Sequence, residues 1–290
     1  MQKILITGGN GQLGREINEL IADFPDFEFL FTDVEELNIA NANILEQFFD
    51  VHKPHYVINC AAYTAVDKAE EETDMAYNVN VTGVENLASV SKNHLSKLIH
   101  ISTDYVFDGR NCKPYIESDR PNPIGIYGQT KREGEEKCLS ANDESVIIRT
   151  SWLYSAFGSN FVKTMLRLGK ERDSLSVVFD QAGTPTYARD LAKVILQIVD
   201  GTEKHYSNWV PGIYHFSDEG VCSWYDFATE IMNISQTKCD IKPVESKDFQ
   251  VTAKRPHYSV LNKTKIKEVF GIQIPYWKES LKDCIATLKN

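Results

Sequence analysis

Short apolar runs alternate with segments of helical periodicity along the first half of the chain. The runs are rich in β-branched residues and apolar at consecutive positions, which is typical of strands buried on both faces. Between them, apolar residues recur about every three or four positions, as they do on one face of a helix. Strands are expected at residues 3–7, 28–32, 56–59, 97–102 and 146–149, and helices at 13–21, after Asn41, after Thr73 and at 124–139.

This alternation predicts an α/β fold. Strands that are separated by helices pair in parallel through right-handed crossovers, and the helices then cover both faces of the sheet. We therefore expect residues 1–151 to form one domain with a Rossmann-type, doubly wound parallel sheet.

Beyond Trp152 the pattern changes. A helix is expected at 160–168, a strand at 176–179 and a helix at 188–199, and shorter pieces follow. We expect residues 152–290 to form a smaller, mixed C-terminal region that packs directly on the first domain and leaves a cleft between them. Some of its elements are expected to return to the sheet.

Composition and charge exclude several classes of partner. Of 290 residues, 42% are hydrophobic and 25% charged, as in a soluble globular protein. No stretch approaches the roughly 18 apolar residues of a membrane span, and the first apolar run is too short for a signal peptide, so we expect a cytoplasmic protein with no membrane partner. The formal net charge of −10 disfavours nucleic acid as a partner. The acidic run 70–72 is interpreted as a solvated face near a helix start.

The six cysteines and seven histidines show no metal-binding pattern. The cysteines are scattered without a Cys-x-x-Cys pair, and the histidines lack the spacing of metal ligands. We therefore expect reduced thiols and no metal site built from these residues.

Three glycines, Gly8, Gly11 and Gly14, lie between the first expected strand and the first expected helix. Glycines at such a turn allow the backbone to approach a pyrophosphate, so we interpret residues 1–151 as a dinucleotide-binding domain, with a purely structural turn as the alternative. Asp33 ends the second strand and can accept hydrogen bonds from the adenosine ribose, which favours NADH, although it could also simply begin a turn. Arg15 is the nearby cation that could balance a 2′-phosphate, so NADPH stays open.

Tyr127 and Lys131 are four positions apart on an expected helix and therefore share one face. An ammonium group beside a phenol favours the phenolate, so we expect Lys131 to lower the pKa of Tyr127 toward the working pH of an acid catalyst. Thr103 and Asp104 end the preceding strand, and ligands bind at the carboxyl ends of strands in such sheets.

Together with Asn59-Cys60-Ala61-Ala62, these motifs resemble the extended short-chain dehydrogenase/reductase family. Longer stretches narrow the resemblance to the dTDP-4-dehydrorhamnose reductases, nearly end to end. The stretches that carry it are residues 65–70, 102–109, 149–152, 160–166 and 255–256.

The resemblance implies an oxidoreductase that reduces the 4-keto group of a nucleotide sugar, dTDP-4-dehydro-L-rhamnose, for surface polysaccharide. It implies that Tyr127 protonates the developing alkoxide, that Thr103 hydrogen bonds the same oxygen, and that Lys131 holds the nicotinamide ribose. The residues that it places at the cofactor, NADPH or NADH, are Gly8, Gly11, Gln12, Leu13, Gly14, Asp33, Asn38, Ile39, Ala62, Tyr63, Thr64, Ile101, Tyr127 and Lys131. Those that it places at the substrate are Thr103, Asp104 and Trp152.

Several alternatives stay open. A regulatory subunit of this fold could bind a dinucleotide without turnover, and an epimerase or dehydratase could use the same sheet; a dehydratase, however, is expected to follow Asp104 with Glu and not with Tyr105. Some relatives bind Mg²⁺ at a dimer interface through glutamates. Glu16 matches one ligand position, but Arg189 occupies another, so both the metal and that dimer are in doubt, and we expect a monomer or a homodimer.

Overall fold

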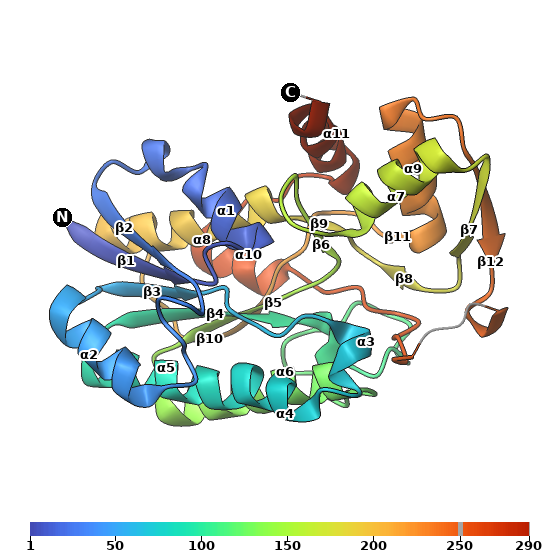
Figure 1. Cartoon of the computed structure of the whole chain (residues 1–290). Coiled ribbons are helices and arrows are strands. Elements are labelled where there is room, and N and C mark those ends of the chain that lie inside the picture. Colours follow the sequence, from blue (N-terminus) through green and yellow to red (C-terminus); the bar gives the residue numbers. More distant parts are fainter. Residues whose placement is uncertain (249–251, 290) are drawn as a thin grey trace.

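The computed structural model describes residues 1–248 and 252–289. Its central element is a parallel six-stranded sheet with the strand order β2-β1-β3-β4-β5-β10 (Figure 1), which confirms the doubly wound α/β fold. The strands of this sheet are β1 (Gln2–Thr7), β2 (Phe27–Thr32), β3 (Tyr56–Asn59), β4 (Lys97–Thr103), β5 (Val146–Thr150) and β10 (Gly212–His215).

Helices cover both faces of the sheet (Figure 1). Alternate residues of β1 point to opposite sides: Ile4 and Ile6 belong to the core beneath α1 and α8, whereas Leu5 belongs to the core beneath α2 and α5. Apolar side chains on both faces of a strand explain why these runs show no polar alternation. The helices of this part are α1 (Gln12–Asn18), α2 (Ala42–His52), α3 (Val66–Ala69), α4 (Thr73–Tyr77), α5 (Gly83–Asn93), α6 (Ile126–Ala141), α8 (Ala188–Glu203) and α10 (Thr264–Phe270), with short 3-10 turns at Ile21–Asp23, Asp104–Val106 and Ser246–Asp248.

The helix expected after Thr73 is interrupted. Between α4 and α5 the chain forms a π-helical segment, Asn78–Thr82, that presents the buried side chain of Asn80 toward the loop after β3. Such π segments are frequent at functional sites.

A second region carries its own apolar core and lies beyond the carboxyl ends of the strands (Figure 1). It contains three small two-stranded sheets, β6 with β9, β8 with β11 and β7 with β12. Its elements are β6 (Leu153–Tyr154), α7 (Phe161–Glu171), β7 (Ser174–Val178), β8 (Ala182–Gly183), β9 (Thr186–Tyr187), β11 (Cys222–Ser223), α9 (Trp224–Ser235), β12 (Asp240–Val244) and α11 (Trp277–Lys289).

The C-terminal half also contributes to the main sheet. β10 pairs with β5 at the edge, and α8 packs against α1 in the same apolar core. Elements from both sides of residue 151 share one apolar core. The division of the chain at that residue stays a prediction.

Within the described residues, no helix combines the length and the apolar character that crossing a membrane requires.

A capping box fixes the start of α9. The Ser223 hydroxyl accepts a hydrogen bond from the backbone N–H of Asp226 (3.0 Å), and the Asp226 carboxylate accepts one from the backbone N–H of Ser223 (2.9 Å). We expect Ser223→Ala to lower the free energy of unfolding by about 1 kcal/mol, because the backbone donor loses its partner. Urea unfolding would measure the change. Ser89→Ala is the control: the Ser89 hydroxyl bonds a carbonyl inside α5, so its removal should leave stability unchanged or slightly higher.

Candidate active site

The glycine loop between β1 and α1 allows neighbouring backbone segments to pack closely together. Gly8 has φ +66°, in the left-handed region, and a Cβ there would lie 2.7 Å from the backbone nitrogen of Ala61. A Cβ on Gly14 would lie 2.6 Å from the Cα of Gly9. The backbone N–H of Gly11 donates to the carbonyl of Gly8 (3.1 Å) and closes the turn. The backbone at Gly8 and Gly14 is thus packed too closely for side chains, and such a compact turn at the start of a helix fits the diphosphate of a dinucleotide.

Asp33 lies at the end of the glycine loop where the adenosine of the dinucleotide is expected. Its Oδ2 accepts a hydrogen bond from the backbone N–H of Asn10 (3.0 Å). Asp33 and Arg15 line one cavity of about 420 Å³. The carboxylate suits ribose hydroxyls and the guanidinium suits a 2′-phosphate, so the cavity offers one group for each form of the cofactor. The other residues that line it are Gly9, Asn10, Asn18, Glu19, Phe31, Thr32, Glu36 and Phe157.

The loop after β3 is held by a residue that the sequence did not reveal. The buried amide of Asn80 accepts from the backbone N–H of Tyr63 (2.9 Å) and donates to its carbonyl (3.1 Å). This pair of bonds fixes the segment that includes Ala62 and Thr64. Asn80 stands out in the structure because it lies in the π-helical segment. The periodicity of the sequence does not indicate that segment.

The remaining residues expected at the cofactor lie nearby in the fold with different exposure. Leu13 and Ile39 are buried in the apolar cores, so only their backbones are suited to contact a ligand. Gln12 begins α1 and accepts a hydrogen bond from the Asn160 amide (2.9 Å), while Asn38 is exposed.

A carboxylate caps the helix that carries Tyr127. Glu70 Oε1 accepts a hydrogen bond from the backbone N–H of Ile126 (2.8 Å), the first residue of α6. A Cβ on Gly125 would lie 2.8 Å from the same oxygen. Glu71 and Glu72 are exposed directly before α4, as the sequence indicated, whereas Glu70 is only partly exposed and its charge caps the N-terminus of a helix that is distant in the sequence.

Lys131 of α6 is buried against strand β4 of the sheet. Its Nζ donates to the carbonyl of Ile101 on β4 (2.7 Å), and its side chain is 2% exposed. Burial lowers the pKa of Lys131 to about 8, and the charge of Glu135 opposes this shift. Glu135 in turn forms a buried two-pronged ion pair with Arg149 of β5 (2.9 and 2.7 Å). These contacts fix α6 to both strands.

Tyr127 lies one helical turn before Lys131 and is partly buried. Burial raises the pKa of its phenol to about 12, a hydrogen bond with Thr103 lowers it, and the charge of Asp104 raises it. The prediction that Lys131 lowers the pKa of Tyr127 below its usual value is wrong. The cost of burying a phenolate dominates, and the ammonium of Lys131 is directed to a backbone carbonyl.

Thr103 and Asp104 end β4 beside this phenol. The Thr103 hydroxyl donates to Asp104 Oδ1 (3.0 Å), and Asp104 is 1% exposed. Burial raises the pKa of Asp104 to about 7, and hydrogen bonds from Ser259 and Thr103 oppose the shift. The structure thus brings Thr103, Asp104 and Tyr127 together at the carboxyl end of β4.

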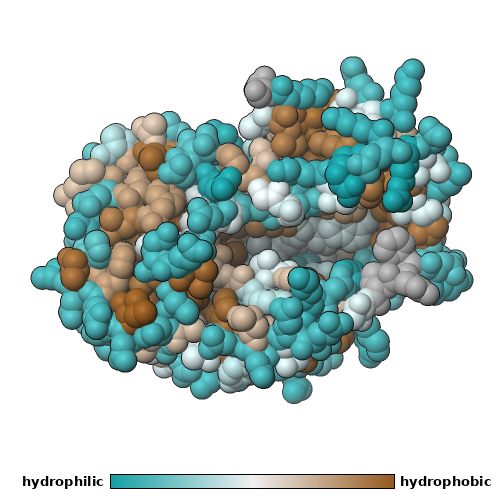
Figure 2. All heavy atoms as spheres, viewed as in Figure 1, coloured by the Kyte–Doolittle hydropathy of each residue, from teal (hydrophilic) through white to brown (hydrophobic). Residues whose placement is uncertain are grey.

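Trp152, the third residue expected at the substrate, follows β5 at the junction with the second region. It is partly buried and stacks on Trp224 of α9. Figure 2 shows the surface hollowed between the body that carries the sheet and the second region.

Glu16 and Arg189 do not fit a divalent cation. Glu16 is 1% exposed and accepts a hydrogen bond from the Ser155 hydroxyl (2.5 Å). Burial raises its pKa, whereas Ser155 and the positive charge of Arg189 lower it. Because a guanidinium cannot ligate a metal, Arg189 leaves Glu16 without the second carboxylate that a Mg²⁺ site of this kind needs.

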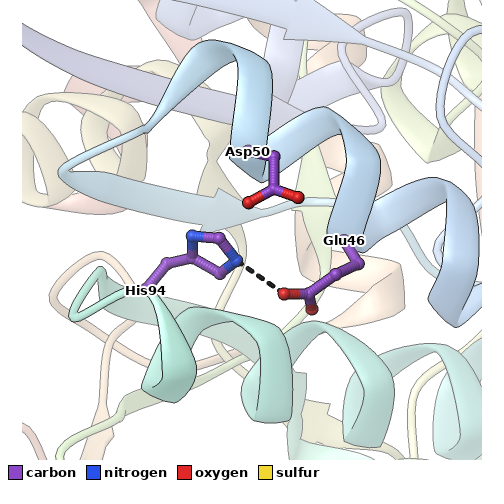
Figure 3. Close-up of side chains that lie close together, drawn as sticks. All are labelled: Glu46, Asp50 and His94. Carbon is purple, nitrogen blue, oxygen red and sulfur yellow. Dashed lines mark hydrogen bonds and ion pairs between the residues drawn. The ribbon is translucent and has the colours of Figure 1, made fainter.

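One other group has metal-ligand chemistry among residues 1–248 and 252–289. Glu46 and Asp50 of α2 face His94 at the end of α5 (Figure 3), with ligand atoms within 4.8 Å of one another. His94 already hydrogen bonds Glu46 (2.8 Å). The group lies under α2, away from Tyr127, and plays no part in the site.

Comparison with known proteins decides the family. The family model described as RmlD substrate binding domain matches residues 1–290. The chain belongs to this family. The RmlD-family chain is 45% identical to the dTDP-4-dehydrorhamnose reductase of Aggregatibacter actinomycetemcomitans, with 98% of each chain covered.

Two solved structures resemble the RmlD-family chain over its whole length. The reductase from Clostridium acetobutylicum has a TM-score of 0.93 at 46% identity and covers 100% of both chains. The reductase from Bacillus anthracis, solved in complex with NADP, has a TM-score of 0.93 at 40% identity and covers 99% of this chain and 100% of its own. The resemblance inferred from the sequence motifs is thereby confirmed.

Proposed function

We propose that this chain reduces the 4-keto group of dTDP-4-dehydrorhamnose to give dTDP-rhamnose, with NADPH or NADH as the reductant. The observation that carries the proposal is the placement of Tyr127 beside Thr103 at the carboxyl end of β4, with Lys131 one helical turn further along α6 and bonded to the carbonyl of Ile101 on β4. The nucleotide-sugar substrate follows from the enzyme named for the relatives from Aggregatibacter and Clostridium.

Each residue has a distinct role in the proposed reaction. A dinucleotide held at the glycine loop and Asp33 would supply a hydride to the ketone carbon. Tyr127 keeps its proton at neutral pH, since its pKa is about 12, and donates it to the ketone oxygen as negative charge develops there. Thr103 hydrogen bonds the same oxygen, and the ammonium of Lys131 holds the ribose. Trp152 and Asp104 contact the sugar.

The test is turnover of dTDP-4-dehydrorhamnose with NADPH and with NADH, followed through the nicotinamide absorbance and by identification of the sugar product. We expect stoichiometric oxidation of the cofactor and formation of dTDP-rhamnose. Oxidation with a different nucleotide keto sugar, and none with this one, would contradict the substrate. Titrations with NADPH and with NADH compare the contributions of Arg15 and Asp33 to cofactor binding.

A dinucleotide-binding regulatory subunit is the main alternative. Such a protein would bind NADPH and leave the sugar unchanged. The grouping of Thr103, Tyr127 and the buried Lys131 favours catalysis, because a module that only binds has no use for a proton donor beside the nicotinamide site. Tyr105 after Asp104 disfavours a dehydratase. The oligomeric state and the cytoplasmic location stay predictions from the sequence.

The pKa values predict how reduction depends on pH. We expect kcat/KM to fall as the pH rises above about 8, because Lys131 loses its proton there while Tyr127 stays protonated. Below that pH the ammonium is present and the rate should be higher. A pH profile of nicotinamide oxidation checks this. Lys131→Arg should move the fall to higher pH, since a guanidinium stays charged; a profile without a fall across the pKa of Lys131 would contradict the assignment.

A further inference from the structure

Trp152 occupies a backbone conformation that large residues rarely adopt. Its φ is +47°, in the left-handed region. Such a conformation persists only where the surroundings hold it, and it is found preferentially at functional sites. Two hydrogen bonds hold this backbone: the Trp152 carbonyl accepts from the N–H of Thr186 (3.2 Å), and the Ser151 hydroxyl donates to the carbonyl of Thr184 (2.8 Å). The indole is therefore directed by its main chain.

The indole of Trp152 stacks on the indole of Trp224. The ring centroids are 3.6 Å apart and the planes differ by 10°. Phe161 of α7 packs against Trp224 with a centroid distance of 4.6 Å. Trp224 is the first residue of α9, and the Ser223 capping box fixes its backbone. The partly buried indole of Trp152 is thus supported by Trp224, which comes from a distant part of the sequence.

Gly183 completes the support from β8. A Cβ on Gly183 would lie 2.6 Å from the indole of Trp152 and 2.8 Å from the hydroxyl of Ser259. The antiparallel pairing of β8 with β11 places Gly183 opposite Cys222, two residues before Trp224. Ser259 also lies close enough to Asp104 to lower the pKa of its carboxyl group. The absence of a side chain at Gly183 therefore lets the indole and Asp104 share one packed assembly.

We propose that Trp224 and Gly183 are positioning residues for substrate recognition: together they hold the indole of Trp152 against the sugar moiety of the nucleotide sugar. This inference rests on the proposed function and on the contact of Trp152 with the substrate. Trp224 acts only through Trp152, so its loss should weaken the binding of substrate and leave proton donation by Tyr127 intact.

The test compares kinetic constants of Trp224→Leu, Trp224→Phe and Gly183→Ala with those of the unmodified chain. We expect Trp224→Leu to raise KM for dTDP-4-dehydrorhamnose roughly tenfold, the upper range for loss of an aromatic pair, with kcat within about threefold and the Kd for NADPH unchanged. Trp224→Phe should recover part of the affinity because it restores a ring. Gly183→Ala should raise KM without a loss of kcat, since the added methyl group displaces the indole.

Circular dichroism gives an independent readout. Two indoles stacked this closely produce an exciton couplet in the far ultraviolet, and we expect Trp224→Leu and Trp152→Leu to remove it. Trp209→Leu is the control, because Trp209 packs on Tyr56 at the opposite end of the sheet and should leave both the couplet and KM unchanged. An unchanged KM in Trp224→Leu, or a loss confined to kcat, overturns the inference. Absence of turnover in the unmodified chain rejects the proposed function, whereas the couplet still reports whether the stack exists.

Discussion

Tyr127→Phe is expected to lower kcat for reduction of the ketone by about 10²–10⁴-fold, the usual contribution of a positioned general acid. The substitution removes only the hydroxyl that donates the proton, and the ring can keep its edge-on packing against Tyr105, 5.5 Å away. The Kd for NADPH should change by no more than a few fold, because the glycine loop and Asp33 are untouched. Steady-state turnover and a separate dinucleotide titration measure the two quantities.

Tyr77→Phe is the matched control for this variant. The Tyr77 hydroxyl donates to Glu133 (2.9 Å), which also lies on α6, but Tyr77 is exposed on α4 and remote from Thr103. It should retain full turnover. If Tyr127→Phe turned over as fast as Tyr77→Phe, Tyr127 would not be the proton donor, and Asp104 would become the residue to examine.

Gly8→Ala is expected to raise the Kd for NADPH roughly 100-fold, of which the left-handed backbone alone accounts for about 1–2 kcal/mol, or a factor near ten. The rest comes from collision of the new methyl group with the backbone of Ala61, at 2.7 and 2.8 Å, and of Cys60, at 2.9 Å. Because of this collision, the loop must move out of the position in which it admits a diphosphate. Fluorescence titration with NADPH would measure the change.

Gly271→Ala separates the two causes. Gly271 has φ +67°, almost the same as Gly8, but among the described residues no atom lies within 4 Å of the added Cβ. It ends α10, far from the glycine loop. We expect a loss of stability of about 1 kcal/mol from the backbone conformation, with no change in NADPH affinity. A Kd that is as unchanged in Gly8→Ala as in Gly271→Ala would show that the glycine loop does not hold the dinucleotide.

Local patterns were sufficient for the first half of the fold. The strand expected at 56–59 matches β3, in which all four residues are buried, and the helix expected at 124–139 overlaps α6 (Ile126–Ala141), whose buried residues recur every three or four positions. The second region was harder. β10 and β12 are short and marked by Gly212 and Pro243, and each is defined by pairing with a strand distant in the sequence. Such pairing leaves little trace in a single segment.

The candidate site shows the same division. The glycine spacing, Thr103, Tyr127 and Lys131 could be chosen from the sequence because they follow predicted strands or share a predicted helical face. The cap that Glu70 provides to α6 and the support that Asn80 gives to Tyr63 depend on contacts between distant segments. The pKa of Tyr127 was predicted in the wrong direction because burial, which dominates it, is a property of the assembled fold.

The edge position of β10 limits how this protein can be divided or recombined. A fragment that stopped at residue 151 would leave unpaired those N–H and C=O groups of β5 that face β10, and would uncover the apolar surface that α1 shares with α8. Unprotected edges of this kind promote aggregation. The two halves of the chain are therefore not interchangeable modules: a chimera that grafts a new C-terminal half must also bring a matching last strand and covering helix.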